Sequence, residues 1–243
     1  MQNLTISPNN IHLFAYTNEK CLSGPVRGVV VNFHGLGHRD MKYEPDGFDL
    51  LFAEHNILTI FPYYGPWIWM NNQAISYVDQ VMAAVKVRHN LANNIPWVSS
   101  GGSMGGLSAL VYARYAAVPP VACAVNCPVC DLPYHATERD DLPRTMLVSF
   151  SHYPKGVEAG MKRHSPVHIA AQLPKVPYLV VHGDADIAVN KAAHSDKLVS
   201  LMQNHDVEYI EVPGMAHCDL HAAPDALRRY QDFIIYHATS YGG

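Results

Sequence analysis

WVSSGGSMGG, residues 97–106, is the stretch that decides the fold of this chain. Residues 97–100 predict a short strand, residues 107–116 predict a helix, and the turn between them matches the pattern G-x-S-x-G. Such a turn holds a serine hydroxyl over the edge of a sheet, and only glycine fits two positions before and two after the serine. The N-terminus of the following helix offers free N–H groups to a developing oxyanion. The stretch therefore predicts that Ser103 is a nucleophile.

Two plainer interpretations compete with this one. A glycine-rich turn can occur without any chemistry, with Ser103 only capping the helix that follows. The glycines could also cradle a phosphate, but no lysine follows them, as it does in phosphate-binding loops. The remaining segments of the chain decide between these interpretations.

The rest of the chain alternates short apolar segments, rich in β-branched residues, with longer segments of helical spacing. That alternation is typical of a mostly parallel, doubly wound sheet with helices on both faces. Further strands are predicted at residues 28–33, 56–61, 121–126, 178–182 and 207–212, and further helices at 73–90, 191–203 and 222–236. We expect one α/β domain over residues 1–243.

Two segments depart from this alternation. Residues 3–6 and 11–16 predict a hairpin-like start around a turn at residues 8–10. Residues 128–175 show no strand pattern and are rich in histidine, proline and charge. Because an insertion near the carboxyl ends of the strands can cover the site of a doubly wound sheet, we expect a small cap there.

A serine hydroxyl becomes a strong nucleophile when an imidazole removes its proton and an acid orients the imidazole. Enzymes with this turn place these residues in the order Ser, Asp or Glu, His. Asp184 and Asp186 follow one predicted strand and His217 follows the last one, so all three fall at the sheet edge that carries Ser103. The order alone leaves both aspartates open.

His217 has rivals among the 15 histidines, notably His182, His194 and His221. It is preferred because it lies in a glycine-containing loop directly after the last predicted strand. We expect His221 to begin the final helix instead.

An oxyanion hole needs two backbone donors. One is the N–H of Met104, directly after the serine. The other is expected in the loop HGLG, residues 34–37, which follows the first parallel strand, and we assign it to Leu36. Four segments in the expected order favour catalysis over a plain turn.

Composition excludes several classes of function. Charged residues make up 16% of the chain, its net charge is −4, and no run of Lys or Arg stands out, which argues against nucleic acid and anionic membranes as partners. The sequence shows no leader pattern and no membrane-spanning stretch, and its 5 cysteines fit a reducing compartment. We expect a cytoplasmic monomer or homodimer that needs no cofactor.

The segments HGLG, GGSMGG, HGDADIAV and GMAH together resemble the α/β-hydrolase superfamily, most of all the catalytic domain of the prolyl-oligopeptidase and dienelactone-hydrolase-like group. The phrase SPVH at residues 165–168 resembles that group as well, and the resemblance spans residues 28–220. It implies the α/β-hydrolase fold. Residues 182–189 resemble the family pattern H-G-x-x-D-x-x-V, which implies that Asp186 is the acid and that Asp184 is structural.

The sequence also departs from both named groups. It shows no counterpart of the propeller that screens peptides in prolyl oligopeptidases, and residues 62–67 lack the Arg-Gly pattern common in those peptidases. Dienelactone hydrolases carry a cysteine nucleophile where this chain has Ser103. These departures favour a stand-alone serine carboxylesterase of the EC 3.1.1 type.

An aromatic cluster is the candidate substrate-binding surface. Tyr63, Tyr64, Trp67 and Trp69 follow a predicted strand, and His34 begins the loop HGLG. Flat rings near the site can stack on a sugar or an aromatic acyl group, although large aromatics more often only pack a loop. The stacking interpretation, with the SMGG turn that feruloyl esterases also carry, predicts feruloyl or acetyl esters of carbohydrates.

Cys127 and Cys130 form a C-x-x-C pair. Zinc would need further ligands and no second pair exists, so we expect packing or free thiols. His217, Asp219 and His221 could also hold a metal, but the catalytic assignment of His217 argues against it. We therefore expect no metal site.

The sequence thus predicts an enzyme that hydrolyses small-molecule or saccharide esters through an acyl-enzyme. A small serine peptidase of the prolyl-oligopeptidase type remains an alternative, and so does a ligand receptor that retains the triad, since this fold hosts both.

Overall fold

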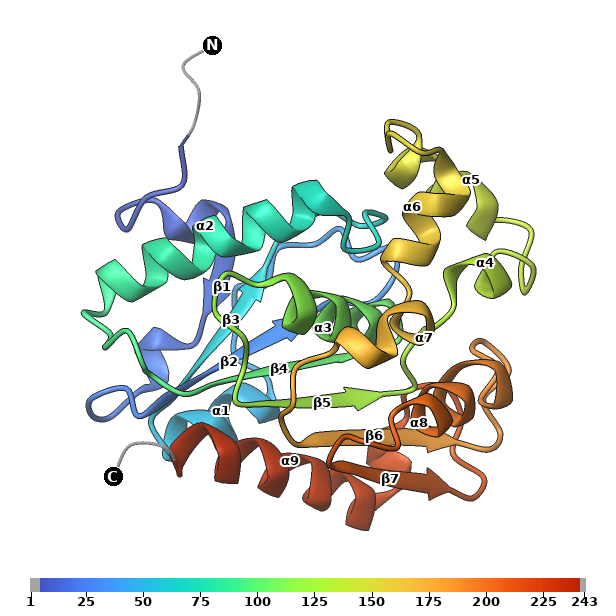
Figure 1. Cartoon of the computed structure of the whole chain (residues 1–243). Helices are drawn as coiled ribbons and strands as arrows, with labels where there is room; N and C mark the ends of the chain where they lie inside the picture. The colour runs from blue at the N-terminus through green and yellow to red at the C-terminus, as the bar shows by residue number, and fades with distance from the viewer. Residues whose placement is uncertain (1–4, 241–243) are drawn as a thin grey trace.

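The computed structural model describes residues 5–240, and in this part of the chain seven strands form one sheet in the order β1-β3-β2-β4-β5-β6-β7. β1 runs antiparallel to β3, and all other neighbours are parallel (Figure 1). The strands are β1 (Ala15–Thr17), β2 (Gly28–Phe33), β3 (Ile57–Pro62), β4 (Trp97–Gly102), β5 (Ala122–Asn126), β6 (Tyr178–Gly183) and β7 (Val207–Val212). The predicted mostly parallel α/β sheet is confirmed.

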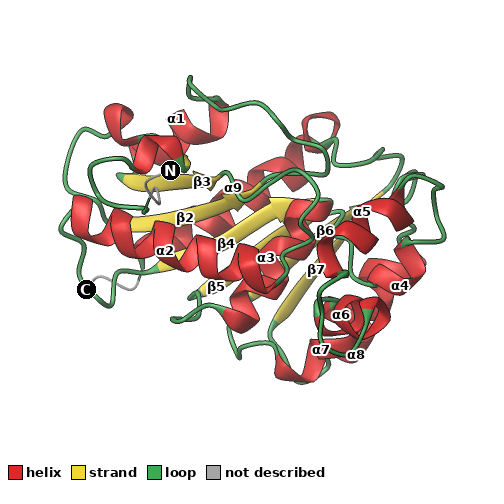
Figure 2. Ribbon diagram, turned by 90° about the horizontal axis from the view of Figure 1, so that it is seen from above, coloured by secondary structure: helices red, strands yellow, loops and turns green. Residues whose placement is uncertain are grey.

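Helices cover both faces of the sheet (Figures 1 and 2). Successive strand residues point to opposite faces, so Val31 and Val30 of β2 pack in two different cores. The core around Val31 includes side chains of α2, α3 and α8, and the core around Val30 includes side chains of α1 and α9. These helices are α1 (Gly47–Glu54), α2 (Asn72–Arg88), α3 (Met104–Tyr115), α8 (Lys197–Leu201) and α9 (Pro224–Thr239).

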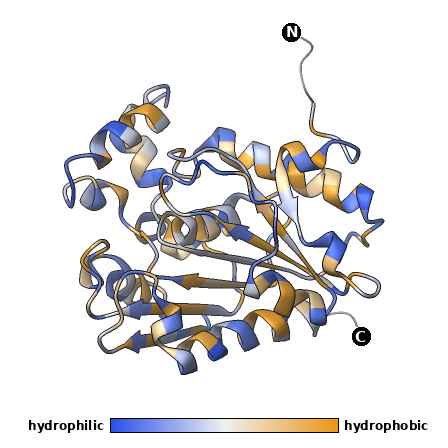
Figure 3. Cartoon of the chain, turned by 180° about the vertical axis from the view of Figure 1, so that it is seen from behind, coloured by the Kyte–Doolittle hydropathy of each residue, from blue (hydrophilic) through white to orange (hydrophobic). Residues whose placement is uncertain are grey.

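The distribution of apolar residues follows from this layering. β6 is buried along its whole length, as expected for a parallel strand that is covered on both faces. α9 is amphipathic instead and buries residues such as Phe233 and Ile234 against the sheet (Figure 3). Within residues 5–240 no helix has the length and apolar character needed to cross a membrane.

β4, the strand that leads to Ser103, is fixed from both faces by polar side chains. Ser99 Oγ donates a hydrogen bond to the carbonyl of Ala109 in α3, at 2.9 Å. Ser100 Oγ lies 2.9 Å from the hydroxyl of Tyr230 in α9. Both serines are buried, and these bonds satisfy hydroxyls that would otherwise be costly in the core. The end of β4 is thereby held in a defined place.

The predicted N-terminal hairpin is wrong. Residues 11–13 form a short 3-10 helix, and β1 pairs with β3 rather than with residues 5–6, while residues 3–4 lie outside the described residues. The side chain of Asn10 accepts a hydrogen bond from the backbone N–H of Ser7 at 2.8 Å. This local bond turns the chain, so the segment after it adds an edge strand to the main sheet.

α1 had no counterpart in the sequence prediction. Its start is a capping box in which Asp49 N–H donates to Asp46 Oδ1 and Asp46 N–H donates to Asp49 Oδ2, both at 3.0 Å. The sequence pattern D-x-x-D at residues 46–49 could have indicated this helix start, but the usual capping box has Ser or Thr followed three residues later by Glu or Gln.

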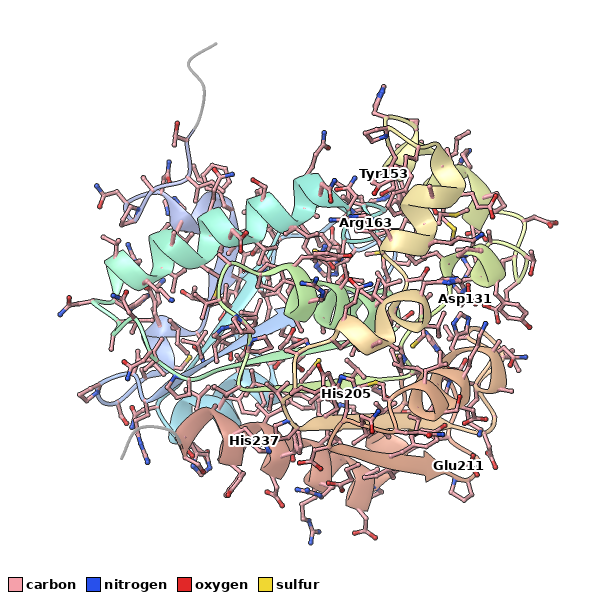
Figure 4. All side chains as sticks on the ribbon, viewed as in Figure 1. Asp131, Tyr153, Arg163, His205, Glu211 and His237 are labelled. Carbon is pink, nitrogen blue, oxygen red and sulfur yellow. The ribbon has the colours of Figure 1, made fainter. Side chains whose placement is uncertain are left out.

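The segment expected to form a cap is helical. It contains α4 (Leu132–His135), α5 (Leu142–Phe150), α6 (Val157–Arg163) and α7 (Pro166–Ile169). α4, α5 and α6 lie beyond the carboxyl ends of the strands (Figure 1). Asp131, at the start of this segment, accepts from Lys197 Nζ of α8 at 2.8 Å, which ties the segment to the body of the protein (Figure 4). Its role as a substrate-selecting cap stays a prediction.

Candidate active site

Ser103 lies at the turn between β4 and α3 in a strained backbone conformation. Its φ is 58° and its ψ is −125°, a region that side-chain-bearing residues rarely adopt and that costs about 1–3 kcal/mol. Two bonds to the end of β5 and to the segment after it hold Ser103 there: Ser103 N–H donates to the carbonyl of Asn126 at 3.0 Å, and the Ser103 carbonyl accepts from Val129 N–H at 3.1 Å. The surrounding fold therefore imposes the turn.

The glycines around Ser103 are required by close backbone contacts. A Cβ at Gly105 would lie 2.1 Å from the carbonyl oxygen of Phe33, and a Cβ at Gly101 would lie 2.4 Å from the carbonyl oxygen of Gly105. Both distances are far below van der Waals contact with rigid backbone. The expectation that no side chain fits two residues before and two after the serine is confirmed.

His217 and Asp186 are joined across the loops that follow β7 and β6. His217 Nδ1 lies 2.7 Å from Asp186 Oδ2. The other carboxylate oxygen, Oδ1, accepts from the backbone N–H groups of Ala188 at 2.8 Å and Val189 at 3.0 Å. The carboxylate is thus fixed within its own loop, and it in turn fixes the orientation of the imidazole.

The pKa values of this pair diverge as expected for an ion pair. Burial would raise the pKa of the Asp186 carboxyl, but hydrogen bonds from His182, His217 and the backbone hold it well below its usual range. Burial would lower the pKa of His217, but the hydrogen bond to Asp186 and the nearby sulfur of Cys127 raise it to about 9. The charged forms of both groups are therefore favoured.

Asp184 has a different set of contacts. Its Oδ1 accepts from the backbone N–H of Gly214 at 2.6 Å and so joins the loop after β6 to the loop after β7. The Asx-type turn of this loop is made by Asp186, whose Oδ1 accepts from the backbone two and three residues on. Of the two candidate acids, the structure places Asp186 against His217 and Asp184 elsewhere.

The rival histidines are engaged away from Ser103. His182 is fully buried, with Nδ1 at 2.6 Å from Ser195 Oγ and Nε2 at 3.2 Å from an Asp186 oxygen. His194 is also fully buried. His221 lies in a short 3-10 helix before α9, so the expectation that it begins the final helix is wrong.

Ser103, His217 and Leu36 line the same cavity, which has a volume of about 770 Å³. In the part of the chain that the structure describes, no hydrogen bond joins Ser103 Oγ to His217. His217 Nε2 has Cys218 Sγ beside it instead, at 3.8 Å. Hydrogen bonds of a catalytic serine are often loose without substrate and tighten in the complex.

Two backbone donors are available to an oxyanion. Leu36 lies in the loop after β2 and lines the cavity, and Met104 is the first residue of α3. Within residues 5–240 neither of these two N–H groups donates to a protein acceptor. A helix N-terminus adds partial positive charge at the same place. The arrangement can therefore stabilise negative charge beside Ser103.

The predicted aromatic surface is only partly present. His34 and Trp69 line the cavity. Tyr64 is buried and its hydroxyl donates to Ser108 Oγ, whereas Tyr63 and Trp67 line other depressions of the surface. The polar tip of a buried tyrosine needs a hydrogen-bond partner, which explains the inward position of Tyr64. Three of the five residues thus lie outside the cavity that holds Ser103.

Other cavity residues were not foreseen. His135 and Arg139 enter the cavity from the segment after β5. His135 Nδ1 bonds to Glu138, which also accepts from His194 Nε2 at 2.9 Å. Burial would raise the pKa of Glu138, but these two bonds lower it to about 2. The sequence pattern H-x-x-E at residues 135–138 could have indicated this contact.

Comparison with known proteins places the chain in a family. A model of the prolyl oligopeptidase family matches residues 64–239, which is more than half of the chain. A search of curated proteins finds no match.

Several solved structures share the fold. The acylaminoacyl peptidase of Pyrococcus horikoshii superposes with a TM-score of 0.72 at 14% identity, over 88% of this chain and 37% of that one. The S-formylglutathione hydrolase of Agrobacterium tumefaciens gives 0.69 at 16% identity, over 94% and 89%. The monoacylglycerol lipase of Paleococcus ferrophilus gives 0.63 at 16% identity, over 92% and 98%.

This chain therefore spans little more than a third of the length of the acylaminoacyl peptidase, and most of the length of the other two enzymes. At these identities the likeness concerns the fold, which is that of the α/β-hydrolases. Taken with the family match over most of the chain, it leads to one conclusion: the chain has the α/β-hydrolase fold and belongs to the prolyl oligopeptidase family.

Proposed function

We propose that the protein is a serine carboxylesterase that hydrolyses its substrate through an acyl-enzyme on Ser103. The observation that carries the proposal is the strained position of Ser103 in the cavity that His217 also lines, with the far ring nitrogen of His217 bonded to the buried Asp186 at 2.7 Å. A nucleophile, a base and an acid that orients the base are the parts that acyl transfer requires.

Acylation starts with attack of Ser103 Oγ on the ester carbonyl. His217 Nε2 accepts the hydroxyl proton, and the buried carboxylate of Asp186 stabilises the imidazolium that forms. The carbonyl oxygen becomes an oxyanion, which the free N–H groups of Leu36 and Met104 bind. His217 then gives its proton to the leaving alcohol. The product of this step is an ester of Ser103.

Deacylation repeats the sequence with water as the nucleophile. His217 takes a proton from water, the hydroxide attacks the acyl carbon, and Ser103 leaves with the proton that His217 returns. Removing a single oxyanion donor typically costs about 10²–10³ in kcat, so the two N–H groups carry much of the rate.

For the substrate we propose small acyl esters of carbohydrates, with acetyl and feruloyl groups as the acyl parts. Trp69 and His34 line the cavity, and its volume of about 770 Å³ lies in the range of sites for small organic ligands. The positions of Tyr63, Tyr64 and Trp67 leave this surface smaller than the sequence predicted.

Cleavage of short peptides is the second candidate, and the match to the prolyl oligopeptidase family favours it. An amide demands that His217 protonate a much poorer leaving group, and the same residues can do so. The two candidate activities therefore differ in the leaving group of the substrate, which is an alcohol for the esterase and an amine for the peptidase.

Steady-state and rapid kinetics on three substrates test the proposal. We expect a burst of p-nitrophenol from p-nitrophenyl acetate, turnover of methyl ferulate or an acetylated sugar, and kcat/KM values for aminoacyl-p-nitroanilides below those for esters. Ser103→Ala should abolish the burst. Higher kcat/KM on the anilides would establish the peptidase, and saturable binding without a burst in the wild type would establish a receptor.

A further inference from the structure

Two cysteines lie beside the imidazole of His217. Cys127 Sγ, Cys218 Sγ and a ring nitrogen of His217 all lie within 4.8 Å of one another. Nδ1 of that ring is bonded to Asp186, so Nε2 is the nitrogen that faces the thiols, at 3.8 Å from Cys218 Sγ. Cys127 directly follows β5 and the other two residues follow β7, so the fold brings together residues that are far apart in the sequence.

The spacing of these atoms suits a tetrahedral metal ion. Zinc binds thiolate sulfur at ~2.3 Å and imidazole nitrogen at ~2.0–2.1 Å, which places a sulfur and a nitrogen ligand roughly 3.5–3.6 Å apart at a tetrahedral angle. The observed separation of 3.8 Å between Cys218 Sγ and His217 Nε2 lies within about 0.3 Å of this distance, so a small movement of one side chain brings both atoms into place. Two thiolates and one imidazole are the ligands that zinc and other thiophilic cations prefer.

The surroundings of the three groups also suit a metal. A metal-bound histidine almost always donates its second N–H to a carboxylate or carbonyl, and His217 has such a partner in Asp186. Cys127 and Cys218 both have a positive φ, of 44° and 57°, which is uncommon for residues other than glycine. The Cys218 N–H donates to Cys127 Sγ at 3.4 Å and so holds the two residues together.

We propose that Cys127, His217 and Cys218 form an inhibitory binding site for a thiophilic divalent cation such as Zn²⁺. His217 and Cys218 line the cavity, so an ion can enter from it and keep its fourth position open toward it. Binding displaces the thiol protons and occupies the lone pair of His217 Nε2. Inhibition rests on the proposed role of His217 as the base, whereas metal binding does not.

Two neighbouring groups do not offer the same chemistry. His135, Glu138 and His194 also lie close together, but His194 Nδ1 accepts from the backbone N–H of Cys130 at 2.9 Å. Its Nε2 therefore carries the proton that it donates to Glu138, and no lone pair is left for a metal. Cys130, the other half of the C-x-x-C pair, directs its buried thiol to the carbonyl of Pro128 at 3.4 Å. The cysteine that lies against Cys127 in the structure is Cys218 rather than Cys130.

Cobalt titration of the whole chain tests the site without any assay of activity. We expect one Co²⁺ per chain, with thiolate-to-cobalt absorption in the near ultraviolet that Zn²⁺ abolishes. Cys127→Ser and Cys218→Ser should each weaken binding by at least about 10-fold. Cys21→Ser, at a thiol outside the cluster, is the matched control and should bind as the wild type does. Circular dichroism checks that each variant is folded, and protection of Cys218 from iodoacetamide by Zn²⁺ gives a second measurement on the wild type.

Inhibition is measured separately, as the rate at which a fluorophosphonate labels the protein. Zn²⁺ should slow labelling of the wild type and of Cys21→Ser, EDTA should restore it, and both cluster variants should resist Zn²⁺. Absence of the cobalt–thiolate absorption would overturn the proposal. So would Zn²⁺ inhibition that persists in both variants, or a Cys127–Cys218 disulfide that forms with peroxide in a protein that does not bind cobalt. Cobalt binding to a protein that no probe labels would leave the metal site standing and refute the esterase.

Discussion

The hydrogen bond between His217 and Asp186 joins a partly exposed imidazole to a fully buried carboxylate. The side chain of His217 is 28% exposed and that of Asp186 is 0% exposed, with 2.7 Å between Nδ1 and Oδ2. The ring can therefore meet a substrate, while the carboxylate that supports it is buried and fixed by two backbone hydrogen bonds. A charge in such surroundings acts more strongly than the same charge in water.

Replacing Asp186 by asparagine should remove that support. We expect Asp186→Asn to lower kcat by up to ~10⁴-fold, because an amide neither stabilises the imidazolium nor selects the right tautomer. Asp184→Asn is the matched control and should keep kcat within a few-fold, since the Asp184 carboxylate accepts from the backbone N–H of Gly214 rather than supporting His217. Ester hydrolysis by both variants provides the measurement, and equal losses would contradict the assignment.

The pH dependence of the reaction should report the raised pKa of His217. Only the neutral imidazole removes a proton from Ser103, so kcat/KM should rise with pH as the imidazolium is deprotonated. Because the pKa of His217 is raised from 6.5 to about 9, the midpoint of this rise should lie above 6.5. Cys127→Ala removes one of the groups that raise it and should move the midpoint to lower pH. A wild-type midpoint at or below 6.5 would speak against this electrostatic picture.

Gly105 should tolerate no side chain. In Gly105→Ala the new Cβ meets the carbonyl oxygen of Phe33 at 2.1 Å, so either β2 or the start of α3 has to move. We expect a loss of more than about 3 kcal/mol in the free energy of unfolding by urea. Gly47→Ala, where a Cβ meets nothing within 4 Å, should leave that free energy nearly unchanged. A mild effect at Gly105 would show that the turn is more plastic than the structure indicates.

The two tryptophans after β3 should behave differently. Trp67 lies outside the cavity that holds Ser103, so Trp67→Ala should change kcat/KM for esters less than ~3-fold. Trp69 lines that cavity and donates its ring N–H to Thr145 Oγ1 at 2.9 Å. Trp69→Phe keeps a flat ring but loses this bond, and it should raise KM for aromatic esters more than for acetate. If the two variants affected KM alike, the cavity would not be the acyl site.

The central sheet was predictable because its strands are short, apolar and separated by glycine-rich loops. All six predicted parallel strands begin and end within two residues of the predicted bounds, and β2 and β7 match them at both ends. The N-terminal hairpin was wrong because Asn10 bends the chain locally and β3 offers a free edge. The short helices of residues 128–175 were missed because their apolar positions pack against one another over too few turns to show a period.

The residues of the candidate site that lie in the turn or loop after a strand, Ser103, Asp186 and His217, could be predicted from the sequence. Such residues must meet at the same sheet edge, and the structure places them there. Contacts across the cavity were not predictable. The approach of Cys218 to Cys127 depends on two residues with left-handed backbone conformations, which no spacing in the sequence reveals.

The central claim is that Ser103 is an activated nucleophile. Labelling with a fluorophosphonate, followed by peptide mapping of the wild type and of Ser103→Ala, tests it most directly. The account predicts a single adduct on Ser103 that is absent from the folded variant. An adduct on another residue, or no adduct on the folded wild type, would contradict it.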